Sequence, residues 1–375
     1  MVKDPKFDDI RPYYEEELPA AMQRIADSEV FPILADYVYP GEPIEKVREK
    51  IRATKTIDEF QLDTMRRVNE QVIARSMTEF TGEGAENLDF TKNYLFVSNH
   101  RDIVLDACLL QYYLVNSGYH TTEITFGANL MMNPVIIDVG RSNKMFRVER
   151  PGTDIKEFYR ASLHLSEYIR YAITEKGESV WIAQRNGRTK NGIDTTDQGI
   201  IKMFCMSETK DKIKALSELN IVPVTVSYEW EPCDVLKAVE LYESQSARYV
   251  KKEGEDLNSI LTGILQPKGH VHFQIGKPVA VEELEAYGAQ TNNEYHKSVA
   301  HLLDSKIRAG YRLYPNNYIA HDILRGTSDN SDKYTAEQKQ AFVSHLAALD
   351  KYTNCDRDSL RQIFLSIYAN PVDNR

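Results

Sequence analysis

Short apolar segments alternate with longer helical ones between residues 89 and 280, and this alternation constrains the fold more than any other feature of the 375-residue chain. The apolar segments are rich in Val, Ile and Phe, which is typical of strands buried in a sheet. Strands that alternate with helices form a mostly parallel sheet covered by helices, so the pattern predicts an α/β fold. The expected strands are Tyr94–Val97, Glu123–Phe126, Met145–Val148, Ser179–Ala183, Ile221–Tyr228 and Val271–Ile275.

The two ends of the chain have helical patterns instead. Apolar residues recur at helical spacing over Arg48–Lys55 and Phe60–Glu79, and polar helical sequence returns near the end of the chain. Residues 232–262 resemble a long helical insertion before the last strand. We therefore expect a helical N-terminal region over 1–88, an α/β core over 89–280 and a helical C-terminal region over 281–375.

Charge and cysteine usage exclude several classes of protein. A net charge of -10 provides no global basic field, so we expect no nucleic-acid partner. Four scattered cysteines without a C-x-x-C pair do not fit a disulfide scaffold or a zinc site, and indicate a reducing cytosol. The acidic stretch after the first residues is unlike a signal peptide, and no apolar run reaches the roughly 20 residues that span a bilayer. We expect a cytoplasmic protein, and attachment to a membrane surface stays open.

A polar sequence from Ser98 to Asp106 separates two apolar segments. In α/β proteins, ligands often bind where core strands end, so its ionisable groups are expected beside a pocket. His100 held by a carboxylate, Asp102 or Asp106, would suit general base catalysis. The alternative is a capped helix start, with Asp102 as the N-cap.

The letters His100-Arg101-Asp102 also resemble the H-R-D catalytic loop of protein kinases. That loop needs a metal-binding Asn five positions after its Asp, and Ala107 stands there. The chain also has no Gly-rich phosphate loop followed by a strand lysine, and no D-F-G. We therefore exclude a kinase.

Two further clusters are candidate anion sites. The first comprises Arg141, Lys144, Arg147 and Arg150. It is either solvated surface charge or, at the strand end marked by Arg150, a clamp for phosphate through a planar guanidinium. The second is the loop from Arg185 to Lys190, which follows an apolar strand. It is either a surface turn or an anion site that combines backbone N–H groups near Gly187 with arginines.

Other candidate residues have mainly structural interpretations. His270 and His272 alternate on an expected strand but have no third ligand at metal-binding spacing, so we predict no metal site. The cysteines are expected to be small buried side chains. The apolar run Leu130–Ile137 is interpreted as core packing or as the lining of an apolar groove.

Taken in order, four blocks resemble the glycerol-3-phosphate and lysophosphatidate acyltransferase superfamily. That family carries N-H-x-x-x-x-D after a strand, a basic F-I-x-R block, an E-G-G-R-S or E-G-T-R-S loop, and an I-V-P-V strand. The counterparts here are Asn99-His100 with Asp106, Phe146–Arg150, Arg185–Thr189 and Ile221–Val224. Lys190-Asn191-Gly192 and Ser227-Tyr228-Glu229 are similar to the R-T-G and G-Y-E of the bacterial glycerol-3-phosphate branch. The resemblance covers roughly residues 90–230.

The resemblance implies a reaction and its substrates. His100, oriented by the carboxylate, would remove the proton from an acceptor hydroxyl as that oxygen attacks an acyl thioester. The donor would be acyl-CoA or acyl carrier protein, the acceptor glycerol 3-phosphate or a lysophospholipid, and no other cofactor is implied. A lipid product implies peripheral attachment to the inner, cytoplasmic face of a membrane. The implied phosphate ligands are Arg150, Arg188, Lys144 and Arg185, and the implied oxyanion loop contains Asn186, Gly187 and Thr189.

The chain departs from the family pattern at three places. Five residues lie between His100 and Asp106, where the family has four. Either the helix start bulges to bring Asp106 back to the imidazole, which we favour, or Asp102 takes that role. Phe146 comes one residue early if Arg150 is the matching arginine. Arg185 replaces the Glu of the third block, which leaves the acceptor open.

Two other functions stay open at this point. A hydrolase using the same His and Asp on water would need a nucleophile or a bound water, and no G-x-S-x-G is present. A non-catalytic lipid- or phosphate-binding protein on the same core is compatible with the missing Glu.

Overall fold

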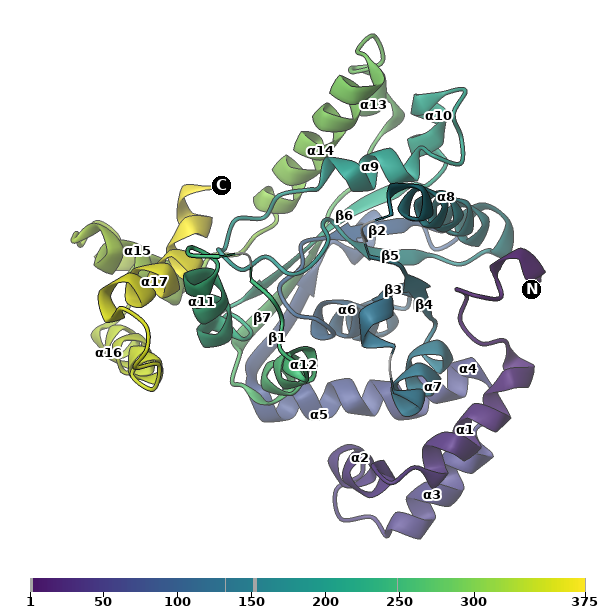
Figure 1. The fold of residues 1–375 in the computed structure, drawn as a ribbon, viewed down its shortest axis with the longest axis horizontal. Coiled ribbons are helices and arrows are strands. Elements are labelled where there is room, and N and C mark those ends of the chain that lie inside the picture. Colours follow the sequence, from purple (N-terminus) through teal and green to yellow (C-terminus); the bar gives the residue numbers. More distant parts are fainter. Residues whose placement is uncertain (1–2, 132, 151–153, 248, 375) are drawn as a thin grey trace.

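The computed structural model describes residues 3–131, 133–150, 154–247 and 249–374. Its centre is a single sheet with the strand order β1-β7-β6-β2-β5-β3-β4 (Figure 1). Five of the six strand pairings are parallel, and only β6 and β7 run antiparallel, within the described residues. The prediction of an α/β fold with a mostly parallel sheet is confirmed. The strands are β1 (Met77–Glu83), β2 (Leu95–Ser98), β3 (Glu123–Gly127), β4 (Met145–Val148), β5 (Val180–Ala183), β6 (Ile221–Tyr228) and β7 (Gly269–Ile275).

Helices cover both faces of the sheet, as expected for strands that are apolar on both sides. One face packs on α8 (Ile155–Tyr171), α9 (Gln198–Phe204) and α14 (Asn292–Ala309). The other face packs on α5 (Arg66–Ser76) and α6 (Leu105–Asn116). Side chains alternate between the two cores along β2, where Leu95 and Val97 face one and Phe96 faces the other. The strand that precedes His100 is therefore fully buried and fixed from both sides.

The helical additions expected at both ends are present and have cores of their own. Near the N-terminus, α1, α2 and α3 pack together. Near the C-terminus, α15, α16 and α17 pack on α11, at the opposite end of the molecule (Figure 1). These helices are α1 (Leu18–Asp27), α2 (Phe31–Val38), α3 (Ile44–Ala53), α11 (Asp234–Glu243), α15 (Pro315–Arg325), α16 (Ala336–His345) and α17 (Arg357–Asp373). The others are α4 (Ile57–Glu59), α7 (Pro134–Ser142), α10 (Lys212–Ser217), α12 (Glu255–Leu265) and α13 (Val281–Glu285).

The structure corrects two details of the sequence prediction. The expected helix Phe60–Glu79 ends at Ser76, and the next residues form β1, which pairs with β7. The sheet therefore begins before residue 89. This strand lacks the buried-strand pattern because it is an edge strand that packs a half-buried Phe80 against Phe273 while most of its other side chains are polar. The expected insertion over 232–262 is not one long helix but two helices, α11 and α12.

No helix among the described residues is long and apolar enough to cross a membrane.

Candidate active site

His100 lies just after the C-terminal end of the central strand β2, and its imidazole contacts a buried carboxylate. The Nδ1 atom of His100 lies 3.0 Å from Oδ2 of Asp106, which is in the first turn of α6. The Asp106 side chain is 1% exposed, whereas that of His100 is 14% exposed. Of the two carboxylates that the sequence left open, the one that contacts the imidazole is Asp106.

Protein donors occupy both oxygens of the Asp106 carboxylate. Oδ2 accepts from the backbone N–H groups of Arg101 at 2.6 Å and Asp102 at 2.9 Å, in addition to His100. Oδ1 accepts from the Tyr228 hydroxyl at 2.8 Å. Four donors are what an ionised carboxylate can accept, so this buried group is fully paired. Burial and the Asp106 charge raise the pKa of Tyr228 well above its usual value, which keeps its hydroxyl a donor.

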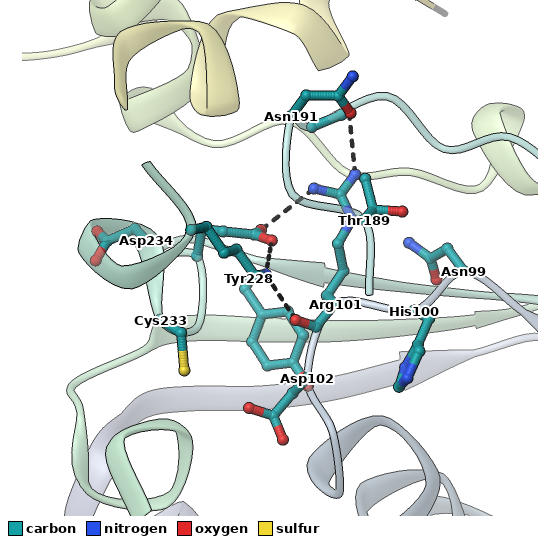
Figure 2. A network of polar contacts seen from close by, with 12 residues as sticks. Asn99, His100, Arg101, Asp102, Thr189, Asn191, Tyr228, Cys233 and Asp234 are labelled. Atoms are coloured by element: carbon teal, nitrogen blue, oxygen red, sulfur yellow. Dashed lines mark hydrogen bonds and ion pairs between the residues drawn. The ribbon is translucent and has the colours of Figure 1, made fainter. Parts of the chain in front are cut away.

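The additional residue between His100 and Asp106 is accommodated by a turn that wraps around the carboxylate. Within that turn, Oδ1 of Asp102 accepts from the backbone N–H groups of Val104 at 2.9 Å and Leu105 at 2.8 Å. Asp102 therefore pairs two N–H groups at the start of α6, but the N-cap residue is Val104 and not, as in the alternative interpretation of the sequence, Asp102. Figure 2 shows its carboxylate directed away from His100, on the side of Cys233. Burial, followed by the neighbouring Asp106 charge, raises the pKa of Asp102.

The contact with Asp106 fixes the proton on the imidazole. An ionised carboxylate accepts hydrogen bonds only, so Nδ1 of His100 must be the donor. The neutral ring then carries its lone pair on Nε2, which is the atom that can act as a base. The ring of Trp181 lies edge-on at 6.1 Å from the ring of His100 and restricts its orientation. The imidazole of His100 is therefore oriented by Asp106, and Nε2, the nitrogen that can accept a proton, lies away from the carboxylate.

The backbone around His100 is held by residues on either side of it. The amide of Asn99 donates to the carbonyl of Val226 at 2.9 Å and accepts from the N–H of the same residue at 2.8 Å. This side chain thus extends the pairing of β2 with β6 beyond the end of the strand. The carbonyl of His100 accepts from the N–H of Thr189 at 2.7 Å, which ties the turn that carries His100 to the loop after β5.

A buried ion-pair network lies directly behind the turn (Figure 2). The guanidinium of Arg101 is 1% exposed and contacts Asp194 at 2.6 Å and Glu231 at 3.2 Å. Lys237 donates to Glu231 at 2.6 Å and to the Arg101 carbonyl at 2.6 Å. Burial opposes the charge of Arg101, but Asp194 and Glu231 hold the pKa of the guanidinium well above its usual value. Two cations and two anions thus balance in the interior, which is the condition for charges to be buried.

The loop after β5 carries the predicted basic residues at the same edge of the sheet as His100. Arg188 is 8% exposed, and its Nη1 atom has no hydrogen-bond partner among the described residues. It lies close enough to Asp102 and Cys233 to influence the ionisation of both. Arg185 is half-buried and Asn186 is exposed. Gly187 has a φ of +74°, a left-handed conformation that glycine adopts without strain.

The basic residues around β4 lie at opposite ends of that strand. Arg150 follows the end of β4, three strands from β2, or roughly 14 Å at the usual strand spacing. Its guanidinium folds over Gly127, where an added Cβ would lie 3.5 Å from Nε. Lys144 precedes β4 and pairs with Glu178 at 3.1 Å, at the opposite edge from His100. The structure therefore separates Lys144 from the other candidate phosphate ligands, because strand direction places the two ends of β4 at different edges.

The remaining candidates have partners that explain their positions. His270 and His272 both contact the Thr81 hydroxyl, at 2.7 and 2.8 Å. In the described ranges, no group of three or more His, Cys, Asp or Glu could hold a metal ion. In the run Leu130–Ile137, Leu130 and Met131 pack against the core that contains α6, Ile136 is exposed, and Met132 lies outside the described residues.

Sequence reasoning missed several residues that build this site. Tyr228 ends a strand that the sequence indicates to be structural with an end beside the pocket, and its similarity to the G-Y-E of the family gave it no role. Its place at the end of β6, beside β2, is the signal that it would reach the same end of the sheet as His100. Asp194, Glu231 and Lys237 carry no local signal. They contact Arg101 across separations of 93 to 136 residues, which only the tertiary fold defines.

The two carboxylates of the turn are expected to differ in their effect on catalysis. Asp106→Asn removes the charge that orients and stabilises the imidazolium, and we expect kcat to fall about a hundredfold. Asp102→Asn retains the oxygen that accepts from the N–H groups at the start of α6, and we expect kcat to remain within about threefold of the original value. Steady-state kinetics of both variants, with thermal unfolding to verify folding, measures this difference. Equal losses in the two variants would contradict the assignment of Asp106.

Asp102 is also expected to shape the pH dependence of stability. Its pKa in the folded protein is raised above the ordinary value of 3.8. The folded state therefore retains a proton that the unfolded chain has released, and this contribution to stability falls as the pH rises from 3.8 through the raised folded value. Over this pH range, the unfolding free energy of the unmodified protein relative to that of Asp102→Asn should fall as the pH rises. Urea titrations at several pH values measure this difference. A difference that does not change with pH would contradict it.

Of the comparisons with known proteins, the one with family models includes the residues assembled here. Residues 79–227 match the family model described as Acyltransferase. No curated protein gives a significant match. Among solved structures, the chain is similar to the 1-acyl-sn-glycerophosphate (LPA) acyltransferase PlsC from Thermotoga maritima, with 14% identity and a TM-score of 0.39. That match covers 79% of this chain and 95% of the other. A likeness this low adds nothing to the family match. The matched stretch, residues 79–227, contains β2, His100, Asp106 and the loop after β5, so the residues of the candidate site lie within the part of the chain that is similar to this family.

Proposed function

We propose that the protein transfers a fatty acyl group from a thioester donor to a hydroxyl of glycerol 3-phosphate or a lysophospholipid in phospholipid biosynthesis. The observation that carries the proposal is the 3.0 Å contact between Nδ1 of His100 and the buried carboxylate of Asp106. It leaves Nε2 of an oriented imidazole free at the edge of the sheet, as a general base requires.

The proposed reaction needs no covalent acyl-enzyme. Nε2 of His100 takes the proton from the acceptor hydroxyl as its oxygen attacks the thioester carbonyl carbon. The carbonyl oxygen becomes an oxyanion, for which the N–H groups around Gly187 are the candidate donors. The tetrahedral intermediate then collapses, the C–S bond breaks, and the imidazolium returns the proton to the departing thiolate. Asp106 stabilises the imidazolium between these two transfers.

The cations at this edge support an acceptor that carries phosphate. The Nη1 atom of Arg188 is buried and has no hydrogen-bond partner in the part of the chain that the structure describes, and such a donor is satisfied when an anion binds. Arg185 adds a second positive charge where the family carries Glu. A phosphate monoester bears nearly two negative charges at neutral pH, so this pair favours glycerol 3-phosphate or lysophosphatidate over a diester headgroup. Arg150, which follows β4, is the third residue that we propose as a ligand of the acceptor phosphate.

An acceptor screen tests the proposed reaction. Purified protein is given a labelled acyl-CoA or acyl carrier protein thioester with glycerol 3-phosphate, lysophosphatidate or lysophosphatidylcholine. Labelled lipid is expected with a monoester acceptor, and His100→Ala run beside it should yield almost none. Free fatty acid formed at the same rate with and without acceptor would support a hydrolase instead. Phosphate-lipid binding without turnover would support the non-catalytic alternative. Either result would overturn the proposal.

Arg188 is expected to determine acceptor affinity. Arg188→Met removes a charge-assisted contact, and the KM for the acceptor should rise by about tenfold or more with a smaller change in kcat. Lys144→Met is the matched control, because Lys144 lies at the opposite edge of the sheet and should leave KM unchanged. Steady-state kinetics over acceptor concentration measures both. An unchanged KM in Arg188→Met would remove Arg188 from the proposed phosphate site.

A further inference from the structure

Helix α12 exposes its large apolar side chains and buries its small ones. Leu257, Leu261 and Leu265 recur every fourth residue and are 53%, 50% and 65% exposed. Ser259 and Gly263 face the protein and are buried. Surface helices of globular proteins normally direct such a leucine stripe to the core. The reversed orientation indicates that the leucine stripe of α12 (Leu257, Leu261 and Leu265) serves contact with something outside the chain.

The inner face of α12 lies against the turn that carries the catalytic pair. A Cβ on Gly263 would lie 2.1 Å from Oδ2 of Asp102, so only glycine permits this approach. The carbonyl of Ser259 accepts from the thiol of Cys233 at 3.2 Å. At the start of the helix, Asp256 accepts from Asn129 at 2.8 Å, in the segment that follows β3. The leucine stripe is thus one helix diameter from the residues around His100, a separation of about 10 Å.

The extent of the leucine stripe distinguishes a lipid surface from a protein partner. Three half-exposed leucines present on the order of 300 Å² of apolar surface. A standard stable protein interface buries about 800 Å² on each partner. A single line of leucines without a groove can instead enter the boundary between headgroups and acyl chains, as amphipathic interfacial helices do. The nearby charges are mixed, since Lys251 pairs with Asp256 and Glu253 is exposed, so the apolar contact must supply the affinity.

We propose that α12 is the element that docks this acyltransferase on a lipid surface, through its leucine stripe and beside the catalytic turn. This proposal rests on the proposed function, because it takes the acceptor or the product to be a lipid delivered from that surface. The N-terminal helix α2 also exposes apolar residues, among them Ile33 at 73%, but it belongs to a separate helical cluster. Only α12 combines an exposed apolar stripe with a contact to Asp102 among the described residues.

Vesicle binding tests the proposal with the full chain. The triple variant Leu257→Ser, Leu261→Ser, Leu265→Ser should lose about tenfold or more in affinity for phosphatidylcholine vesicles, because each leucine loses apolar burial. Adding phosphatidylglycerol should change the binding of the unmodified protein little. The matched control Val281→Ser, Leu324→Ser, Val343→Ser alters three exposed residues on three other helices and should bind normally. Turnover of a short-chain, water-soluble thioester with glycerol 3-phosphate should remain within about twofold in both variants.

Several results would overturn the docking role of α12. They are normal vesicle binding by the α12 variant, no vesicle binding by the unmodified protein, and loss of binding only in Ile33→Ser with Leu34→Ser. A change of oligomeric state in the α12 variant on gel filtration, without a change in vesicle binding, would assign the leucine stripe to a second copy. His100→Ala should bind vesicles normally, so failure of the docking proposal is distinguishable from failure of the proposed reaction.

Discussion

Replacing His100 with alanine is expected to reduce kcat about a thousandfold while the protein remains folded. General base catalysis contributes about 10²- to 10⁴-fold in enzymes, and the imidazole that contacts the Asp106 carboxylate is that of His100. The side chain is partly exposed and contacts Asp106, whose carboxylate retains two backbone donors and Tyr228 without it. Kinetics with a labelled thioester measures the loss, and thermal unfolding verifies the fold.

The control for this experiment is another histidine. His120 is exposed and follows α6 at the end away from Asp106, so His120→Ala should retain full turnover. His100→Gln should be as inactive as His100→Ala, because its amide cannot accept a proton at neutral pH. Near-normal turnover in either His100 variant would remove the proposed base.

Replacing Asp194 with alanine is expected to produce the largest loss of stability, about 3–5 kcal/mol, because it leaves a buried guanidinium without its main counter-charge. Asp194 accepts from Arg101 at 2.6 Å, from Asn99 at 3.1 Å and from the Thr189 hydroxyl at 3.0 Å. Glu231 remains, but it also pairs with Lys237. Urea unfolding should show a lower midpoint with little change in slope.

The matched control lies three residues further along the same loop. Asp197 caps α9 by accepting from the N–H of Gly199 at 2.8 Å, at an exposed position. Asp197→Ala should cost only about 1 kcal/mol, as is usual for loss of an N-cap. If both variants lost the same stability, the network around Arg101 would be no more important than a surface cap.

The alternation of apolar strands and helices was sufficient to predict the core of the fold, because strands buried on both faces have a strong local pattern. β2 is the clearest case, since all four of its residues are buried. β1 was not predictable in the same way. It is an edge strand with several exposed side chains, and its pairing with β7 joins residues 77–83 to residues 269–274.

The site was predictable in kind but not in detail. The position of His100 after a buried strand indicated a base, and the family resemblance ordered the blocks around it. The path of the turn after His100 determines which carboxylate contacts the imidazole, because the N–H groups of Arg101 and Asp102 both donate to Asp106. The spacing of residues in the sequence does not define that path. Lys144 and Arg150 are six residues apart, but the four-residue strand β4 lies between them, so they are at opposite ends of the strands of the sheet.

The hydrogen bonds of the Asn99 amide bear on how the proposed reaction would use the binding energy of its substrates. They let the chain leave the sheet while the N–H and the carbonyl of Val226 on the neighbouring strand stay paired, so the turn is ordered before any ligand arrives. The four donors on Asp106 are likewise in place beforehand. In the proposed reaction, little protein motion would then be required as charge develops on His100, because the polar surroundings are already arranged for the imidazolium. The binding energy of the proposed acyl donor and acceptor would instead serve to align the hydroxyl, the thioester and the base.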